Sequence, residues 1–421
     1  MSLIGTLATG VSGILTNSRA LNIIGDNISN INTTGFKSSK AVFGDLFSTS
    51  LGGGTLTSQV GRGTNLIGSL QSFAQGAFEN STSALDLAID GNGFFIVNDG
   101  VGNFYTRAGQ FRINQDGLVE TLTGEILQGF EITNNVVGTT LTDVSLTGVQ
   151  SLPQPTTTFT LGAQLDGSAV TGFTFNSPIQ VFNSVGSQDI LSVQFTKVAT
   201  AGNDWTVAIT SSIGTIASTV PASPFTLNFD TSGQLLGFNG GGAGSLADVV
   251  IDLNYSLSSP PAAASQLVTW SLVDFGTTVT NGSMTAFAAP SNNNSVVQDG
   301  FGSGILVGVS VDFDGTVFGL FDNGQSQNLF QLGLANFLSP TGLTRLGQNL
   351  FAESRLSGQP IISLPETGAF GSILGSTLEL SNVDLAEEFV NLIKTQQAFQ
   401  ASARIISTTD DLLTETVNLT R

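Results

Sequence analysis

The sequence predicts a multidomain, mainly β protein with long α-helical termini. Apolar residues recur every three or four positions at both ends, and turn dipeptides separate β-branched and aromatic runs between them. The pattern of strand-like runs and loops changes again near residues 151 and 298. A chain of 421 residues is long enough for two or three domains. We expect the N- and C-terminal helices to pair as a coiled-coil-like inner domain, followed by an inner β domain and an inserted outer β domain.

The expected domains each combine segments from both halves of the chain, apart from the insert. Their predicted boundaries are 1–31 with 382–421 for the terminal helical domain, 32–81 with 360–381 for an extended linking region, 82–150 with 299–359 for the inner β domain, and 151–298 for the outer β domain.

The N-terminal segment carries a helical pattern that stops at a polar stretch. Apolar side chains from Ile4 to Ile31 keep three- and four-residue spacing with Ser18 as the one polar break, and a helix over Leu3–Ile31 would be ~43 Å long. The pattern ends inside "GDNISNINTTGFKSSK", residues 25–40, at Thr33-Thr34-Gly35. Because glycine supplies backbone freedom where a chain leaves a helix, we interpret this stretch as a joint.

The C-terminal segment predicts a second helix. From Leu385 to Val417 the spacing alternates between three and four residues, which gives a heptad seam with two polar interruptions. Ser381 or Asp384 marks its start, and Asp384 followed by Glu387 resembles a capping box.

Both seams are candidates for self-assembly. Helices of this kind are marginal alone and need a partner surface. The simplest partners are each other and the same helices in neighbouring copies, although both helices could instead pack on the chain's own β core. The residues expected at the assembly interface are Leu7, Val11, Ile14, Leu21, Ile24, Ile28, Ile31, Leu385, Phe389, Leu392, Phe399, Ile406, Leu413 and Val417.

Between the helices the chain has the pattern of strands and turns. From Ser151 to Gln298, runs such as "TTTFTL" and "WTVAIT" alternate with Gly/Ser/Asn loops, which indicates a second β domain inserted into the first. Leu46–Ser81 is weakly periodic and predicts an extended segment or long hairpin. The expected hairpin turns are Asp90-Gly91-Asn92-Gly93, Gln115-Asp116-Gly117, Thr123-Gly124, Asp314-Gly315 and Asp322-Asn323-Gly324.

Composition excludes several kinds of partner and chemistry. Without Cys or His the chain cannot form a Ser-His-Asp triad, a Cys-His dyad or a zinc site built from these residues. The formal net charge is −19, and residues 113–344 hold one basic residue against 16 carboxylates, so we expect no nucleic-acid partner. No apolar run approaches the ~18 residues of a membrane span. The glycine-interrupted start also lacks the pattern of a cleavable secretory signal.

Carboxylate pairs are the remaining candidates for catalysis. Asp312 and Asp314 would share a strand face and could serve glycoside hydrolysis, but Asp314 has the pattern of a turn residue. Asp86 and Asp90 are no stronger, since Asp90 also starts a turn. No stretch matches a calcium loop, a Walker A loop or GxGxxG. We therefore predict no catalytic residue, no cofactor, no metal and no enzymatic activity.

A surface-exposed carbohydrate-binding or adhesive β protein is the alternative from another functional class. Such a protein would bind glycans through exposed aromatic side chains, for which Trp205, Trp270 and Tyr255 are the candidates. These residue types in β runs are more typical of sheet cores.

The polar stretch at residues 25–40 resembles the N-terminal motif of the bacterial flagellar rod and hook family of axial proteins. "LDLAIDGNGFFIV" (residues 85–97) is similar to the family's shared β domain, and "SNVDLAEEFVNLIKTQQAFQASARII" resembles its C-terminal helix. Asp26 stands where Asn is common, and Gln397 where Arg is usual. The N-terminal motif is carried by Asn27, Ser29, Asn30, Thr33, Gly35, Phe36 and Lys37.

The insert separates two branches of that family. Rod-type members lack a large insert, whereas "PIQVFNSVGSQDILSVQFTKV" looks like the outer domain of hook-type members. Asn183 and Gln188 depart from this resemblance, since Asp and His are frequent there. The resemblance favours a hook-type subunit, with a distal-rod-type axial protein as the alternative.

What the resemblance implies is a structural role. Hook-type members self-assemble into a flexible helical tube that transmits motor torque to the filament as a universal joint. They are exported unfolded, without a cleaved signal peptide, by the flagellar type III apparatus, and form the extracellular hook on the basal body. The implied partners are further copies of the chain, the distal rod, hook cap and hook-filament junction proteins, and the export apparatus.

Overall fold

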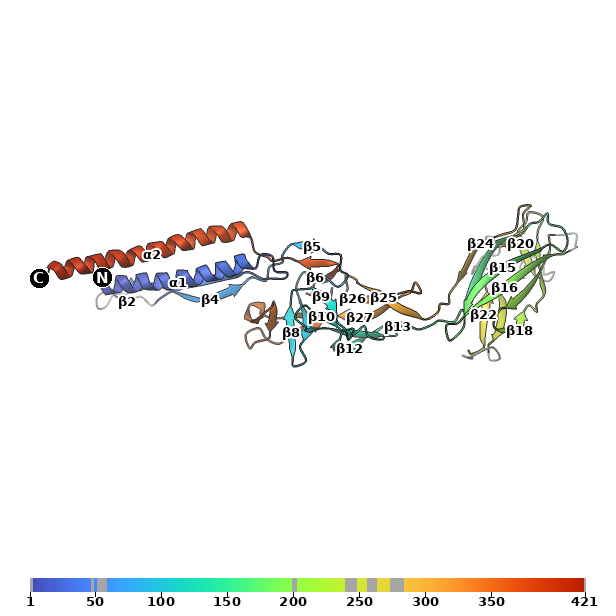
Figure 1. Cartoon of the computed structure of the whole chain (residues 1–421), viewed down its shortest axis with the longest axis horizontal. Coiled ribbons are helices and arrows are strands. Elements are labelled where there is room, and N and C mark those ends of the chain that lie inside the picture. Colours follow the sequence, from blue (N-terminus) through green and yellow to red (C-terminus); the bar gives the residue numbers. More distant parts are fainter. Residues whose placement is uncertain are drawn as a thin grey trace. The chain divides into compact units, whose positions relative to one another are not determined.

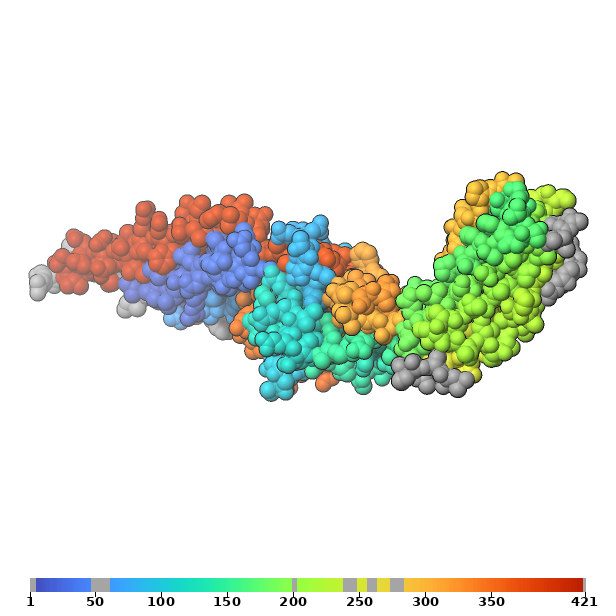
Figure 2. Space-filling model, turned by 45° about the vertical axis from the view of Figure 1, so that its right-hand side comes forward, coloured from blue at the N-terminus to red at the C-terminus, as the bar shows by residue number. Residues whose placement is uncertain are grey.

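The structure, a computed structural model, describes residues 3–46, 49–50, 59–198, 203–238, 248–255, 263–272 and 284–419. It is mainly β, with one long helix near each terminus (Figure 1). The chain forms two compact units, which Figure 2 shows as space-filling surfaces. The first unit contains residues 1–148, 308–319 and 326–421, and the second contains residues 149–307 and 320–325.

The two helices belong to the first unit and pack against each other in antiparallel orientation (Figure 1). They are α1 (Leu3–Ser29) and α2 (Leu385–Leu419). Of the two predicted starts, Ser381 and Asp384, it is Asp384 that caps α2, because its Oδ1 accepts hydrogen bonds from the backbone N–H of Ala386 at 2.8 Å and of Glu387 at 3.2 Å.

α1 ends at Ser29, two residues before the predicted Ile31. Beyond Ser29 the backbone N–H groups of Ile31 and Thr33 bind carbonyls three residues back, at 3.4 and 3.1 Å. These tighter turns replace the four-residue hydrogen bonds of the helix, so the apolar spacing continues for a few residues past the helix itself.

A β ribbon runs along α1. β1 (Ser39–Asp45) and β4 (Thr64–Gln71) pair antiparallel, and both contact α1 (Figure 1). β2 (Thr49–Ser50) and β3 (Gln59–Val60) continue the ribbon. Of the two alternatives predicted for residues 46–81, an extended segment or a long hairpin, the described strands fit the hairpin, which begins earlier, at Ser39. Residues 51–58 of that prediction lie outside the described residues.

The rest of the first unit is a β domain with an aromatic core. Phe94 lies at its centre, and its ring meets the edges of Phe73 at 5.5 Å and Phe337 at 5.9 Å between centroids. The strands of the main sheet run in the order β27-β11-β7-β8-β30-β29. The remaining strands of this unit, with the two that continue into the second, are β5 (Phe78–Asn80), β6 (Leu87–Asp90), β7 (Phe94–Asn98), β8 (Asn103–Thr106), β9 (Phe111–Ile113), β10 (Val119–Thr121), β11 (Ile126–Thr133), β12 (Val136–Asp143), β25 (Gly304–Val311), β26 (Thr316–Phe321), β27 (Ser326–Leu332), β28 (Leu334–Asn336), β29 (Thr344–Gly347), β30 (Leu350–Ala352), β31 (Ile361–Ser363), β32 (Ser372–Gly375) and β33 (Thr377–Glu379), with a short 3-10 helix, η1 (Pro340–Gly342).

Four of the five predicted hairpin turns are confirmed. They join β9 to β10, β10 to β11, β25 to β26, and β26 to β27, each of which pairs with the next. The prediction at Asp90-Gly91-Asn92-Gly93 is wrong, because β6 pairs with β32 while β7 pairs with β8, β11 and β28. The two glycines there, with φ of 111° and 140°, turn the chain from one sheet to another.

The second unit is built from two sheets around one core. Inward-facing side chains alternate with outward-facing ones in most of its strands, and the buried ones form a single apolar cluster. Trp205, Trp270 and Tyr255 lie in that cluster with at most 1% exposed surface. Its strands are β13 (Gln150–Ser151), β14 (Thr158–Gln164), β15 (Thr174–Phe182), β16 (Gln188–Lys197), β17 (Trp205–Ser211), β18 (Thr215–Val220), β19 (Phe225–Phe229), β20 (Leu235–Phe238), β21 (Val249–Asn254), β22 (Gln266–Trp270), β23 (Met284–Thr285) and β24 (Asn292–Gln298).

Candidate functional site

Two glycines of α1 lie directly against α2. A Cβ on Gly10 would lie 2.8 Å from Ile406 Cγ1, and one on Gly13 would lie 2.6 Å from Ser402 Oγ. Cβ atoms do not approach other atoms so closely, so these glycines allow the two helix backbones to come together. The apolar spacing of the sequence did not single them out, although two glycines three positions apart share one helix face.

The structure places the predicted interface residues around this contact as well as in it. Ile24 is buried, and most of the others are half-buried along the two helices. Four remain substantially exposed, namely Val11 (40%), Leu385 (40%), Phe389 (48%) and Val417 (61%). The half-buried ones are Leu7, Ile14, Leu21, Ile28, Ile31, Leu392, Phe399, Ile406 and Leu413.

Asn27 connects α1 to both of its neighbours at the joint. Its Oδ1 accepts a hydrogen bond from the Ser39 backbone N–H at 2.9 Å, and its Nδ2 donates to the Ser39 carbonyl at 2.8 Å. Nδ2 also donates to Oε1 of Glu388 on α2 at 2.9 Å. Burial raises the pKa of Glu388, and the bond from Asn27 opposes that shift. One buried amide therefore ties α1, β1 and α2 together.

Asn30 and Thr33 shape the turn after α1. Asn30 Nδ2 donates to the Asp26 carbonyl at 2.8 Å, and Asn30 Oδ1 accepts from the Thr33 hydroxyl at 3.2 Å. Both contacts are local, as expected for Asn and Thr at the end of a helix. These two motif residues set the path of the chain.

Gly35 is required by its backbone conformation and by its surroundings. Its φ is +68°, and a Cβ there would lie 2.5 Å from the backbone nitrogen of Ala108 and 2.6 Å from the carbonyl carbon of Arg107. Its N–H donates to the Glu379 carbonyl at 2.8 Å. The joint thus rests directly on the β domain at this point, and only glycine fits.

Phe36 anchors the end of the turn. Its side chain is 2% exposed, and the guanidinium of Arg345 lies 5.5 Å from the ring centroid. The same guanidinium is 3.8 Å from Asp26 Oδ2 on α1. Arg345 therefore joins the helix end and the turn to β29.

Lys37 is part of a buried ionic cluster. Its Nζ lies 2.6 Å from Glu379 Oε1 and donates to the Ala74 carbonyl at 2.9 Å. Arg107 Nη1 lies 3.3 Å from the other oxygen of Glu379. Burial lowers the pKa of Lys37 and of Arg107, and the carboxylate of Glu379 opposes both shifts. Glu379 and Arg107 were not predicted, because no local pattern in the sequence connects them to Lys37.

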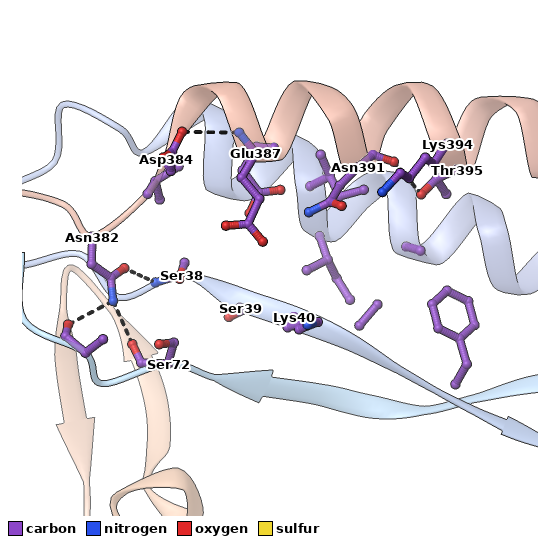
Figure 3. A pocket seen from close by; sticks show the side chains of 18 of the residues that line it. Ser38, Ser39, Lys40, Ser72, Asn382, Asp384, Glu387, Asn391, Lys394 and Thr395 are labelled. Carbon is purple, nitrogen blue, oxygen red and sulfur yellow. Dashed lines mark hydrogen bonds between the residues drawn. The ribbon is translucent and has the colours of Figure 1, made fainter.

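Asn382 closes the joint from the C-terminal side. Its Oδ1 accepts from the Ser38 backbone N–H at 2.8 Å, and its Nδ2 donates to the carbonyls of Ser72 and Ala74 at 2.9 Å (Figure 3). The side-chain amide of Asn382 therefore connects its own segment, which leads into α2, to Ser38 and to residues 72–74.

A groove of about 470 Å³ lies between α1, α2 and β1. Glu387, Asn391 and Lys394 border it from α2, while Lys40 borders it from β1 (Figure 3). Its apolar lining consists of Ala20, Ile23, Ile24, Ala41, Phe43, Ala74 and Val383. We refer to it below as the α1–α2–β1 groove.

The carboxylate pairs considered for catalysis form hydrogen bonds with nearby residues. Asp314 Oδ1 accepts from the Thr316 N–H at 2.9 Å, and the Asp312 carbonyl accepts from Gly315 N–H at 2.9 Å. Asp86 accepts from the Ser81 hydroxyl, and Asp90 accepts from Gln75 at 3.2 Å. Within the described residues no three acidic side chains gather as ligands for a metal ion. Among the described residues, no helix is both long enough and apolar enough to cross a membrane.

Comparison with known proteins gives matches along most of the chain. The family described as flagella basal body rod protein matches residues 7–37, and the flagellar hook protein FlgE/F/G D1 domain matches residues 88–163. The flagellar basal body protein FlaE D2 domain matches residues 151–301, and the flagellar basal body rod FlgEFG protein C-terminal family matches residues 375–419.

Whole-length relatives are similar from end to end. The chain is 32% identical to the flagellar hook protein FlgE of Borreliella burgdorferi, covering 98% of this chain and 99% of that protein. It is 34% identical to FlgE of Rhizobium meliloti over 100% of both chains. It is 32% identical to FlgE of Escherichia coli, covering 97% of this chain and 98% of that protein.

Proposed function

The chain belongs to the family of flagellar hook proteins and is a structural subunit of the bacterial flagellar hook, and we propose that its two terminal helices form the inner layer of a self-assembled tube. Within this layer the helices pair in a coiled-coil-like manner with each other and with the same helices of neighbouring copies. The assembly interface is formed by the seam residues of α1 and α2.

The exposure of large apolar side chains on the two helices carries this proposal. Val11, Leu385, Phe389 and Val417 each keep 40% or more of their surface exposed in the single chain. Covering these exposed apolar side chains with a partner removes apolar surface from water, which is energetically favourable. Assembly into a tube supplies that partner, and the family to which the chain belongs is that of a polymeric axial structure.

We further propose that the chain consists of four domains or regions that form successive layers of the tube. The helical domain covers residues 1–31 and 382–421, and the linking region covers 32–81 and 360–381. The inner β domain covers 82–150 and 299–359, with the outer β domain inserted at 151–298. The division of the chain into two compact units supports an inserted domain near the last of these boundaries.

The mechanical role follows from the position of a hook in the flagellum. The tube transmits motor torque to the filament while it bends, and the chain reaches the tip unfolded through the flagellar type III apparatus. The absence of cysteine supports this route because no disulfide can form before export. The proposed partners are other copies of the chain, the distal rod, hook cap and hook-filament junction proteins, and the export apparatus.

Electron microscopy of cells that lack this gene tests the proposal. Basal bodies with complete rods and no hook are expected, and a plasmid copy of the gene should restore hooks. Truncated rods would instead assign the chain to the distal rod, and normal hooks in the absence of the gene would contradict both assignments.

A further inference from the structure

α2 presents an uncharged apolar ridge away from α1. Leu385, Phe389 and Ile393 follow one another at four-residue spacing, and Val390 lies beside them. Their side chains are 40%, 48%, 52% and 49% exposed, respectively. These four residues are called the α2 ridge below. Apolar side chains at this spacing form a continuous stripe along a helix.

The α2 ridge and the α1–α2–β1 groove lie on opposite sides of the same helix. Glu387 and Asn391, which border the groove, each precede a ridge residue by two positions. At 100° per residue, two positions correspond to about 160° around the helix axis. The subunit therefore carries a concave apolar surface and a convex apolar surface that face in nearly opposite directions.

The two surfaces match in chemistry. The lining of the groove includes the apolar side chains of Ile23, Ile24, Phe43 and Val383 beside polar ones, and its charged residues are Lys40, Asp384, Glu387, Glu388 and Lys394. The ridge itself contains no charged residue, so it brings no charge of its own into the apolar part of the groove.

We propose that the α1–α2–β1 groove of one subunit receives the α2 ridge of a neighbouring copy. A groove and a ridge on opposite faces make a heterologous contact, in which each copy uses one surface and leaves the other open for the next copy. Contacts of this kind build open helical arrays, as a tubular polymer requires. The inference rests on the proposed function and specifies the surfaces through which the helical layer assembles.

The size of the contact fits a subunit that assembles only at the growing polymer. Four half-exposed side chains offer far less than the ~800 Å² per partner that a stable isolated complex buries. One such contact cannot hold two copies together, but each subunit of a helical array makes several contacts at once.

Engineered cysteines test the contact directly because the chain contains none. Ala41→Cys places a thiol in the groove and Phe389→Cys places one on the ridge. Hooks isolated from cells that produce the double variant should give, after mild oxidation, a ladder of covalent multimers on a denaturing gel, reversed by reductant. Each single variant should give monomers. The control pair Val101→Cys with Phe389→Cys, in which Val101 is 94% exposed on a loop of the β domain, should also give no ladder.

Several outcomes would overturn the inference. Assembled hooks without multimers, both from this pair and from Ile23→Cys with Ile393→Cys, would show that groove and ridge do not meet, while the proposed function stands. Dimers from Phe389→Cys alone would show a ridge-to-ridge contact instead. If a double variant does not assemble, hooks built from a mixture of the two single variants give dimers when the surfaces meet and none when they do not. Failure of the unmodified chain to form hooks would remove the proposed function itself.

Discussion

The Nζ of Lys37 lies 2.6 Å from Oε1 of Glu379, and neither side chain is exposed to solvent. Glu379 also accepts a hydrogen bond from the backbone N–H of Gly76 at 2.9 Å and faces Arg107 on its other side. One carboxylate thus balances two buried cations at the point where the joint meets the β domain.

Replacing Glu379 by Gln should strongly destabilise the first unit. The variant leaves Lys37 and Arg107 buried without a carboxylate, and removal of one partner from a buried ion pair costs about 3–5 kcal/mol. Glu120→Gln is the matched control, since it breaks the Arg112–Glu120 pair in which Arg112 is 56% exposed, and it should cost at most about 1 kcal/mol.

Urea unfolding distinguishes the units in this experiment. Both tryptophans of the chain lie in the core of the second unit, so tryptophan fluorescence follows that unit while helical circular dichroism follows the first. The tryptophan transition should stay where it is in Glu379→Gln. Equal losses from the Glu379 and Glu120 variants would contradict the role of the buried cluster.

Gly35→Ala should destabilise more than a change of backbone conformation alone explains. Gly148 is the matched control, because its φ is also +68° and a Cβ there would meet nothing within 4 Å. Gly148→Ala should cost about 1–2 kcal/mol for the left-handed conformation. Gly35→Ala should exceed this because its methyl group would collide with the backbone at Arg107 and Ala108. If the Gly35→Ala and Gly148→Ala variants had identical unfolding midpoints in urea, the backbone near Gly35 would have to move enough to accommodate the methyl group.

Glu388→Gln should change how stability depends on pH. The pKa of Glu388 is raised in the folded chain, so protonation favours the folded state. Its contribution is fully present below the unfolded value near 4.5 and is lost as the pH rises through the raised pKa. The Gln variant keeps the acceptor for Asn27, so it should be at least as stable as the natural chain at pH 7.

The difference between Glu388→Gln and the natural chain should shrink as the pH falls toward 4.5, measured by thermal unfolding of the helix pair. Glu388→Ala also loses the acceptor at 2.9 Å and should be less stable than the Gln variant at every pH. A constant difference between the Gln variant and the natural chain across this range would show that Glu388 does not titrate differently in the folded state.

Leu392→Asp combined with Phe399→Asp should prevent polymerisation while the β units stay folded. Both positions are half-buried along α2, and an unpaired carboxylate in an apolar contact is strongly unfavourable. The sedimentable fraction should fall at least ~10-fold, since 1.4 kcal/mol already corresponds to that factor. Val101→Asp, on an exposed loop, is the control and should assemble normally. Undiminished assembly of the double variant would refute the seam as an interface.

Local patterns predicted the parts of this molecule that depend on near neighbours. The spacing of apolar residues at both ends of the chain predicted the two helices, and Asp384 was one of the two residues predicted to start α2. Four turn dipeptides gave four hairpins, since a turn and its two strands lie within a few residues of each other. The fifth hairpin prediction was wrong at Gly91 and Gly93, because glycines in such a turn can also direct the chain into another sheet.

The joint could be predicted as a motif but not as a structure. Its Gly35 and Lys37 were identified, whereas Glu379 and Glu388 were not. The hydrogen bond from Lys37 to Glu379 spans 342 positions, and that from Asn27 to Glu388 spans 361. Periodicity and motif spacing in the sequence do not indicate which residues come into contact over such separations. Gly10 and Gly13 were passed over for another reason, because they contribute by absence of a side chain.

The same separation between Lys37 and Glu379 sets an order of events for a newly made chain. The N-terminal segment leaves the ribosome first, yet Lys37 has no access to the carboxylate of Glu379 until 342 further residues have followed. Closure of so long a loop is among the last steps of folding. The joint therefore cannot close its buried ion pair until β33, which carries Glu379, has been synthesised.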